Sequence, residues 1–153
     1  MATELSPELL PELHAHACET YPGECCGVVV ALADGSQQTV RIRNVQDELH
    51  AADPQAYTRT SRTAYVWDSA DYKKAIDLWE APGNRLLAFY HSHPDHEAYF
   101  SEEDLAQATP LGEPSYPEAL QLVISVFDGQ LCDTKAYRWS AEVDGYVEVS
   151  LDV

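Results

Sequence analysis

The hydrophobic and polar positions of the chain follow helical spacing in some segments and strand spacing in others. Apolar residues at helical spacing predict a first helix within residues 7–20, and Pro11 indicates that its regular part begins late. The apolar run 25–33 predicts a buried strand, and the alternating residues 38–45 predict its hairpin partner. Residues 44–62 are polar, show little periodicity and are expected to be irregular.

The second half of the chain carries the same two patterns. A polar cap at Asp68 or Ser69 predicts a helix that runs to about residue 80, and a short helix is expected over residues 101–108. Strands are expected at residues 63–67, 86–91, 120–127, 130–139 and 146–151, with Asp128-Gly129 and Asp144-Gly145 as turns between the last three.

This order of elements predicts the α/β class in its α+β form, with a mainly antiparallel mixed sheet flanked by helices. A chain of 153 residues, 45% of them hydrophobic, can bury a core by itself. The chain shows no internal repeat, low-complexity tract or flexible linker. We therefore expect one domain over residues 1–153. Nothing in the sequence specifies an oligomeric state.

Charge and hydropathy disfavour several classes of function, although charge alone does not decide the function. The chain has 26 acidic residues against 9 lysines and arginines, a net charge of −17. Such a surface repels phosphate backbones, which disfavours direct binding of nucleic acid. The longest apolar stretches are too short to span a bilayer, and the N-terminal residues lack the basic and apolar regions of a signal peptide. A cytoplasmic protein without a membrane partner is expected.

Candidate chemistry is concentrated in residues 91–104. His91 and His93 are two positions apart on a predicted strand, so both face the same side and form a natural clamp for a metal ion. Ser101 and Asp104 have the spacing of a capping box, which alone would explain both residues. A helix that begins there could also direct Asp104 toward the histidines. Two histidines and one aspartate would leave a fourth tetrahedral position open, as in catalytic zinc sites.

A catalytic zinc site also needs a base for its water. Glu24 is a candidate because it lies between a predicted helix end and a buried strand. Taken alone, however, Glu24 is better explained as a charge on the surface of a loop. Nothing in the local sequence connects it to the histidines.

A family resemblance makes this connection. The pattern Glu24 … His91-x-His93-Pro94-x6-Ser101-x-x-Asp104 resembles the JAMM signature of MPN-type metalloproteases. That signature is a glutamate followed by H-x-H, ten residues and an aspartate, with a serine three residues before the aspartate. Residues 24–27, Glu-Cys-Cys-Gly, resemble the family's E-x-C-G stretch at the start of a strand. The resemblance covers most of the chain.

The resemblance implies the MPN fold, whose layers are similar to those of cytidine deaminases. It also implies that His91, His93 and Asp104 bind one zinc ion. Glu24 would act as the general acid and base, and Ser101 would help to hold the bound water and stabilise the oxyanion. Such an enzyme would be a hydrolase, a zinc metallopeptidase.

The resemblance also suggests a class of substrate. The chain is similar to compact prokaryotic members of the family, because it has little room for the insertions that eukaryotic deubiquitinases carry. Those compact members are associated with ubiquitin-like sulfur-carrier proteins that end in Gly-Gly. We therefore expect hydrolysis of the peptide or isopeptide bond after such a tail. The alternatives are a deubiquitinase-like isopeptidase with another substrate and a non-catalytic scaffold of the MPN type.

Overall fold

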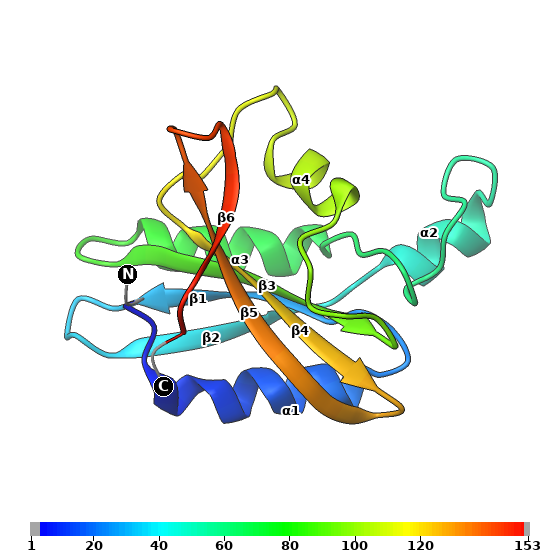
Figure 1. The fold of residues 1–153 in the computed structure, drawn as a ribbon, viewed down its shortest axis with the longest axis horizontal. Coiled ribbons are helices and arrows are strands. Elements are labelled where there is room, and N and C mark those ends of the chain that lie inside the picture. Colours follow the sequence, from blue (N-terminus) through cyan, green and yellow to red (C-terminus); the bar gives the residue numbers. More distant parts are fainter. Residues whose placement is uncertain (1–3, 152–153) are drawn as a thin grey trace.

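The computed structural model of the protein describes residues 4–151 and is built on a six-stranded sheet (Figure 1). The strand order is β2-β1-β3-β4-β5-β6; β3 and β4 pair in parallel, and the other neighbours are antiparallel. The strands are β1 (Cys26–Ala31), β2 (Gln37–Ile42), β3 (Arg85–Pro94), β4 (Leu120–Phe127), β5 (Gln130–Ser140) and β6 (Gly145–Val149). The predicted fold class, with its mainly antiparallel mixed sheet, is confirmed.

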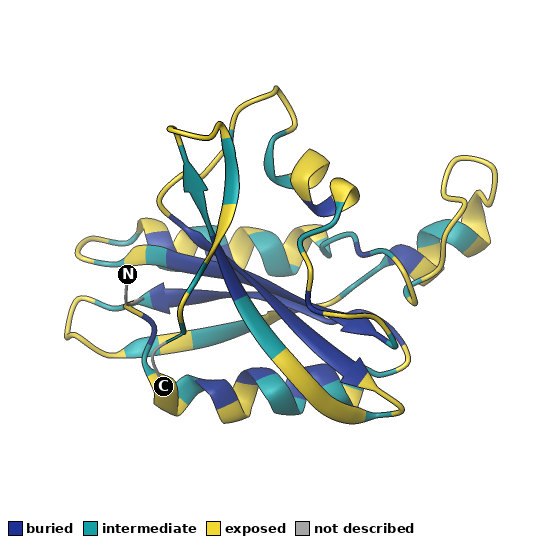
Figure 2. Cartoon of the chain, in the orientation of Figure 1, coloured by how far each residue is buried: buried dark blue, intermediate teal, exposed yellow. Residues whose placement is uncertain are grey.

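Helices cover both faces of the sheet (Figure 1). A short 3-10 helix, η1 (Pro7–Leu9), leads into α1 (Leu10–Thr20), which packs on one face, and α3 (Ser69–Glu80) packs on the other. Because side chains alternate along a strand, Val29 of β1 packs in the cluster on the α1 side, whereas its neighbours Val28 and Val30 pack on the α3 side. The central strands are buried, and the edge strands β2 and β6 are more exposed (Figure 2).

Several local predictions are confirmed. The first helix begins with a 3-10 turn, as Pro11 indicated. The side chain of Asp68 caps α3 by accepting a hydrogen bond from the backbone nitrogen of Asp71. Asp128 and Gly129 have φ angles of 52° and 78°, the left-handed conformations that a two-residue turn between β4 and β5 requires.

Two predictions in the segment between β2 and α3 are wrong. Residues 44–62 are not irregular throughout, because they contain the helix α2 (Gln46–Ala52). Its N-cap residue, Val45, makes no side-chain capping bond, so the sequence carried no start signal. Residues 63–67 form no strand; Trp67 makes only an isolated bridge to Asn44. The Asn44 side chain bonds the backbone of Ala64 and Val66, and one backbone bond, from Val45 to Val66, lies beside these contacts.

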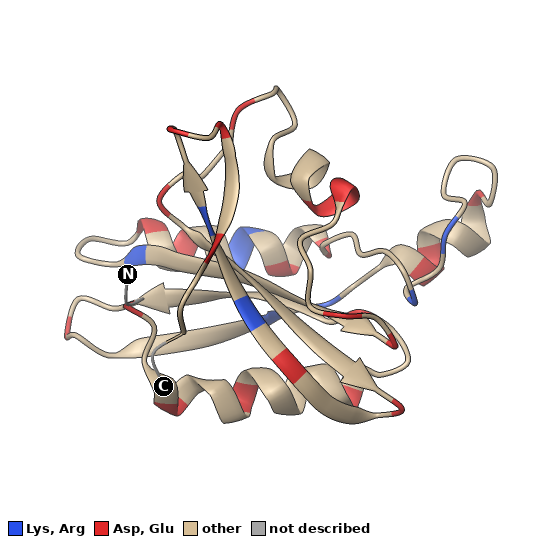
Figure 3. Ribbon diagram, in the orientation of Figure 1, with Lys and Arg blue, Asp and Glu red and all other residues tan. Residues whose placement is uncertain are grey.

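Acidic residues occur on all four α-helices (Figure 3). In residues 4–151 no helix has both the length and the hydropathy needed to cross a membrane. The first three residues of the segment that was assessed for a signal peptide lie outside the described part of the chain.

Candidate metal centre and its cleft

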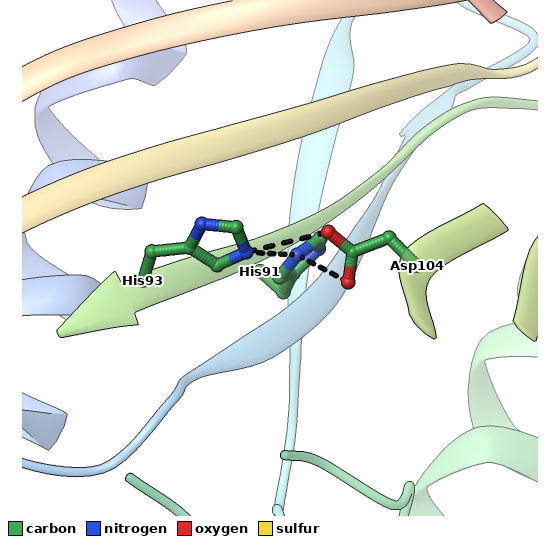
Figure 4. A group of neighbouring side chains, drawn as sticks. All are labelled: His91, His93 and Asp104. Carbon is green, nitrogen blue, oxygen red and sulfur yellow. Dashed lines mark hydrogen bonds and ion pairs between the residues drawn. The ribbon is translucent and has the colours of Figure 1, made fainter. Parts of the chain in front are cut away.

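Two histidines from the end of β3 form the centre of the candidate site. His91 and His93 lie on the same face of the strand, and their side chains are 1% and 7% exposed. Their Nε2 atoms are 3.2 Å apart, so the two rings point to one spot (Figure 4). The alternation of strand side chains therefore gives the clamp that the spacing predicted.

The third member of the cluster is Asp104 of α4 (Glu102–Ala108). Its carboxylate oxygens lie 3.1 Å from Nε2 of His91 and 3.3 Å from Nε2 of His93 (Figure 4). The predicted capping box is also present: Ser101 Oγ accepts from the Asp104 nitrogen at 3.1 Å, and Asp104 Oδ2 accepts from the Ser101 nitrogen at 3.0 Å. The cap fixes the direction of the carboxylate, so its structural role and its place in the cluster support each other.

Hydrogen bonds determine which ring nitrogens are available in this cluster. Nδ1 of His93 lies 2.8 Å from the carbonyl oxygen of Glu97, which can only accept, so Nδ1 carries the proton. The lone pair of Nε2 then faces Asp104 and His91, as in a metal-binding histidine. The ring of His91 stacks on Tyr65 with centroids 5.0 Å apart. Within the described chain, the buried Nδ1 of His91 has no hydrogen-bond partner.

The electrostatics of the cluster favour a cation. Burial alone would raise the pKa of Asp104, but interactions with His91 and His93 hold it well below its usual range. A buried carboxylate and two imidazole nitrogens thus converge within 4.8 Å of one another. Such a concentration of acceptors is stable only with a proton or a metal ion between them. His91, His93 and Asp104 could therefore hold a metal ion.

Glu24 precedes β1 and is 6% exposed, so it is not the surface charge that its local sequence suggested. Its backbone nitrogen donates to the carbonyl oxygen of Ser61 at 2.6 Å, and Asn44 Nδ2 donates to its carbonyl oxygen at 2.9 Å. Burial, together with the negative charge of Asp104, raises the pKa of Glu24 to about 9. A buried carboxyl with a raised pKa is typical of functional sites.

A cavity of about 620 Å³ connects these residues. Glu24, His93, Ser101 and Asp104 line it, together with parts of the segment 56–66 and the exposed ring of Tyr99. The structure therefore brings all five predicted site residues together, since His91 contacts Asp104 directly. The cluster therefore lies at the wall of a cavity, which is where binding sites are usually found.

Two residues that shape this site, Asn44 and Tyr65, were not predicted from the sequence to do so. Asn44 uses its whole hydrogen-bonding capacity: its amide nitrogen donates to the carbonyls of Glu24 and Ala64, and its oxygen accepts from the nitrogens of Gln46 and Val66. It thereby ties the glutamate to the wall of the cleft. Tyr65, which stacks on His91, lay in a segment predicted to be a strand. Both roles depend on contacts between residues that are far apart in the sequence.

The chain is similar to known proteins both in sequence and in fold. Residues 6–139 match the family model described as prokaryotic homologs of the JAB domain. The chain is 30% identical over 140 residues to the CysO-cysteine peptidase of Mycobacterium tuberculosis (strain ATCC 25618 / H37Rv), covering 92% of this chain and 82% of the relative. It is 27% identical to the desampylase of Haloferax volcanii, covering 100% of this chain and 94% of that protein.

Solved structures show the same fold. A protein from Desulfitobacterium hafniense has a TM-score of 0.68 at 23% identity, covering 99% of this chain and 91% of that chain. A JAB1/MPN domain protein from Archaeoglobus fulgidus has a TM-score of 0.51 at 17% identity, covering 95% of this chain and 93% of that chain. At these identities the likeness concerns the fold alone.

Proposed function

The chain belongs to the prokaryotic homologues of the JAB domain, and from this membership we propose that it is a zinc-dependent peptidase. Its substrate would be a ubiquitin-like sulfur-carrier protein, cleaved at the peptide or isopeptide bond after a Gly-Gly tail. The proposal rests on one observation. His91, His93 and Asp104 converge beside a cavity that Glu24 also lines. The relatives named CysO-cysteine peptidase and desampylase support a hydrolase of this class.

The cluster fits zinc. In a tetrahedral site with ligands at about 2.0–2.1 Å, neighbouring ligand atoms are about 3.3 Å apart. The nitrogen–nitrogen separation of 3.2 Å and the nitrogen–oxygen separations of 3.1 and 3.3 Å agree with this value. Two imidazoles and one carboxylate are also a donor set that zinc uses in catalytic sites. When bound, zinc would lower the pKa of a water molecule and polarise the scissile carbonyl group.

Glu24 is the proposed general base. It lies buried on the wall of the same cavity as Ser101 and Asp104, where few water molecules can compete for its carboxylate. The positive charge of a bound zinc ion would oppose the burial and the charge of Asp104 that raise the pKa of Glu24, and would so favour its carboxylate form. This carboxylate would accept a proton from the attacking water and later deliver it to the leaving amine. The backbone bonds from Asn44 and to Ser61 hold this glutamate in place.

Ser101 is the proposed donor to the developing oxyanion. Its oxygen accepts the hydrogen bond of the helix cap, which leaves its proton free for a second bond. Because Ser101 also lines the cavity, this proton can point toward the substrate carbonyl. A donor placed before the reaction begins stabilises charge that develops only in the transition state.

A Gly-Gly tail suits this site because it can pass through a narrow cleft as an extended segment without side-chain clashes. A cytoplasmic location is also part of the proposal, and the free state of all four cysteines supports it. The complete cluster of three possible ligands favours an enzyme over a scaffold of the same fold. An isopeptidase for another conjugate remains the alternative that substrate profiling distinguishes.

The test is intact-mass analysis of a sulfur-carrier protein extended by Gly-Gly-Xaa, incubated with the zinc-loaded enzyme. We expect loss of Xaa with the wild type. Glu24→Gln should bind zinc and be at least ~100-fold slower, as expected after removal of a general base. Glu102→Gln, an exposed change on the first turn of α4, is the control and should retain activity.

Two results would contradict the proposal. Near wild-type activity of Glu24→Gln would reject its role as the base. An intact carrier after incubation with the zinc-loaded enzyme would reject the Gly-Gly substrate.

A further inference from the structure

A second, smaller cavity of about 90 Å³ adjoins the metal cluster. Tyr65, Asp104 and Gln107 line both this cavity and the larger cleft, so the two spaces meet at the cluster. The function of the cluster itself does not explain the smaller cavity.

Aromatic rings form most of the wall of this cavity. Phe89 lies two residues before His91 on the same face of β3, which places the two side chains about 6.7 Å apart along the strand. Tyr116 packs against Phe89 with ring centroids 5.4 Å apart, and Trp67 packs against Phe89 at 5.5 Å. These contacts give the cavity walls of packed aromatic rings next to the candidate metal cluster.

We propose that this cavity binds the side chain of the residue that follows the scissile bond, and that it selects an uncharged aliphatic, thiol or thioether side chain. The inference rests on the proposed function. Both residues before the bond are glycines in that proposal, and glycine has no side chain to occupy a pocket. A side-chain pocket next to the cluster therefore serves the released residue.

Size and chemistry define what the pocket accepts. Its volume is well below the ~150 Å³ of an engineered apolar cavity that binds benzene, which favours side chains smaller than a phenyl ring. Aromatic walls make favourable contacts with sulfur and with aliphatic carbon. Its described lining includes no lysine or arginine, and its one acidic residue, Asp104, is part of the cluster. The polar side chains of Gln107, Ser115 and Gln121 also line it, but none of them carries a charge that would offset the lost hydration of a charged side chain.

The experiment uses the zinc-loaded full-length enzyme and a sulfur-carrier protein extended by Gly-Gly-Xaa, with Xaa as alanine, cysteine, leucine, methionine, phenylalanine or aspartate. Release of Xaa is followed by intact mass to give kcat/KM. We expect cysteine, leucine and methionine to exceed alanine by about tenfold, since burying one or two methylene groups gives discrimination of this order. Phenylalanine and aspartate should fall below alanine.

Two variants of the wall test the assignment to this cavity. Ala108→Leu fills part of it and should lower kcat/KM for leucine and methionine about tenfold, with little change for alanine. Tyr116→Ala removes a ring from the wall and should raise kcat/KM for phenylalanine relative to alanine. Leu111→Ser, a change at a 93% exposed residue outside this wall, is the control and should keep the wild-type profile.

The outcomes separate this inference from the function on which it rests. Equal cleavage of all six extensions, or an unchanged profile in both wall variants, would overturn the pocket and leave the peptidase standing. An intact carrier with every extension, alanine included, would overturn the proposed function and the pocket together.

Discussion

A buried group of side chains that includes histidine lies on each face of β3, and the two groups differ in how their hydrogen-bonding atoms are matched. On one face, His91 and His93 meet each other and Asp104 beside the cleft. On the other face, His16 of α1 meets Tyr90, whose hydroxyl lies 2.7 Å from the imidazole Nδ1. Both groups of side chains are at least nine-tenths buried.

The difference shows that burial of a histidine alone does not indicate function. A hydroxyl and a neutral imidazole can satisfy each other, and the ring of Tyr90 packs so closely that a Cβ on Gly27 would lie 2.5 Å from it. The face that carries His91 and His93 has more hydrogen-bond acceptors than protons, and it borders the larger cavity. We therefore expect changes on the Asp104 face to affect metal binding and activity, and changes on the His16 face to affect stability.

The largest expected effect is that of His93→Ala. Loss of one of three ligands should remove bound zinc and reduce peptidase activity to background, because the two remaining donors no longer enclose the ion. The fold should be mostly retained, since the core clusters around the sheet do not depend on this side chain. Zinc content, activity and thermal unfolding are the measurements.

His96→Ala is the matched control for zinc content and unfolding, because His96 lines the same cleft but is exposed and lies outside the cluster. It should retain zinc and a normal unfolding temperature. Global unfolding of His93→Ala would break the comparison, because it would give the Asp104 face a mainly structural role.

Asn44→Asp should have the second-largest effect. This change replaces the donor to the carbonyl oxygens of Glu24 and Ala64 by a carboxylate oxygen, so we expect the free energy of unfolding to fall by about 2–4 kcal/mol. Because Glu24 loses part of its support, kcat should also fall by at least ~10-fold. Urea unfolding and steady-state kinetics measure the two effects.

Asn84→Asp provides the comparison for Asn44→Asp. Asn84 also bonds a backbone nitrogen and a backbone carbonyl, those of Ala33 and Leu78, but it lies outside the cleft. The Asn84→Asp variant should have a lower free energy of unfolding than the wild type and an unchanged kcat. Equal loss of kcat in the two variants would show that Asn44 has no particular role in positioning the base.

The site could be predicted from the sequence only where its signals are local. The spacing of His91 and His93 on a strand, and of Ser101 and Asp104 in a helix cap, follows from the periodicity of single elements. The burial of Glu24 does not, because the residues that hold its backbone, Asn44 and Ser61, are distant in sequence, and only the family resemblance connected it to the cluster.

The same distinction explains the errors in the fold. The long strands and α3 carry clear periodicity or a polar cap, and their positions were predicted to within a few residues. Helix α2 begins without a side-chain cap, and residues 63–67 are held by the distant Asn44. A single sequence shows neither kind of support, because the partners are far apart along the chain.

Tyr90→Phe should have a smaller effect, confined to stability. Loss of the hydroxyl leaves the buried Nδ1 of His16 without its partner, which should cost about 1–3 kcal/mol in the free energy of unfolding. Metal content and kcat should not change, because the hydroxyl lies on the α1 side of the sheet. Urea unfolding with kinetics checks both statements. A large loss of kcat at unchanged stability would show that the two faces are coupled.

The smallest effect concerns the pH dependence of stability on the same face. Burial, assisted by the charge of Arg41 and opposed by Glu12 and Glu19, lowers the pKa of His16 to about 4. In the unfolded chain a histidine has a pKa near 6.5, so between these values the unfolded state binds more protons than the folded state. Stability from the neutral ring is fully present above about pH 6.5 and is lost as the pH falls toward about 4.

His16→Gln tests this assignment, because glutamine can still bond the hydroxyl of Tyr90 but does not titrate. After allowance for solvent screening, the wild type should lose about 1–2 kcal/mol more than the variant between pH 7 and pH 4.5. His14, whose pKa burial also lowers, is present in both proteins, so the difference between the two unfolding curves isolates His16. Parallel curves would mean that His16 binds its proton over the same pH range in the folded protein as in the unfolded chain, and the two faces of β3 would then differ less than their hydrogen bonds indicate.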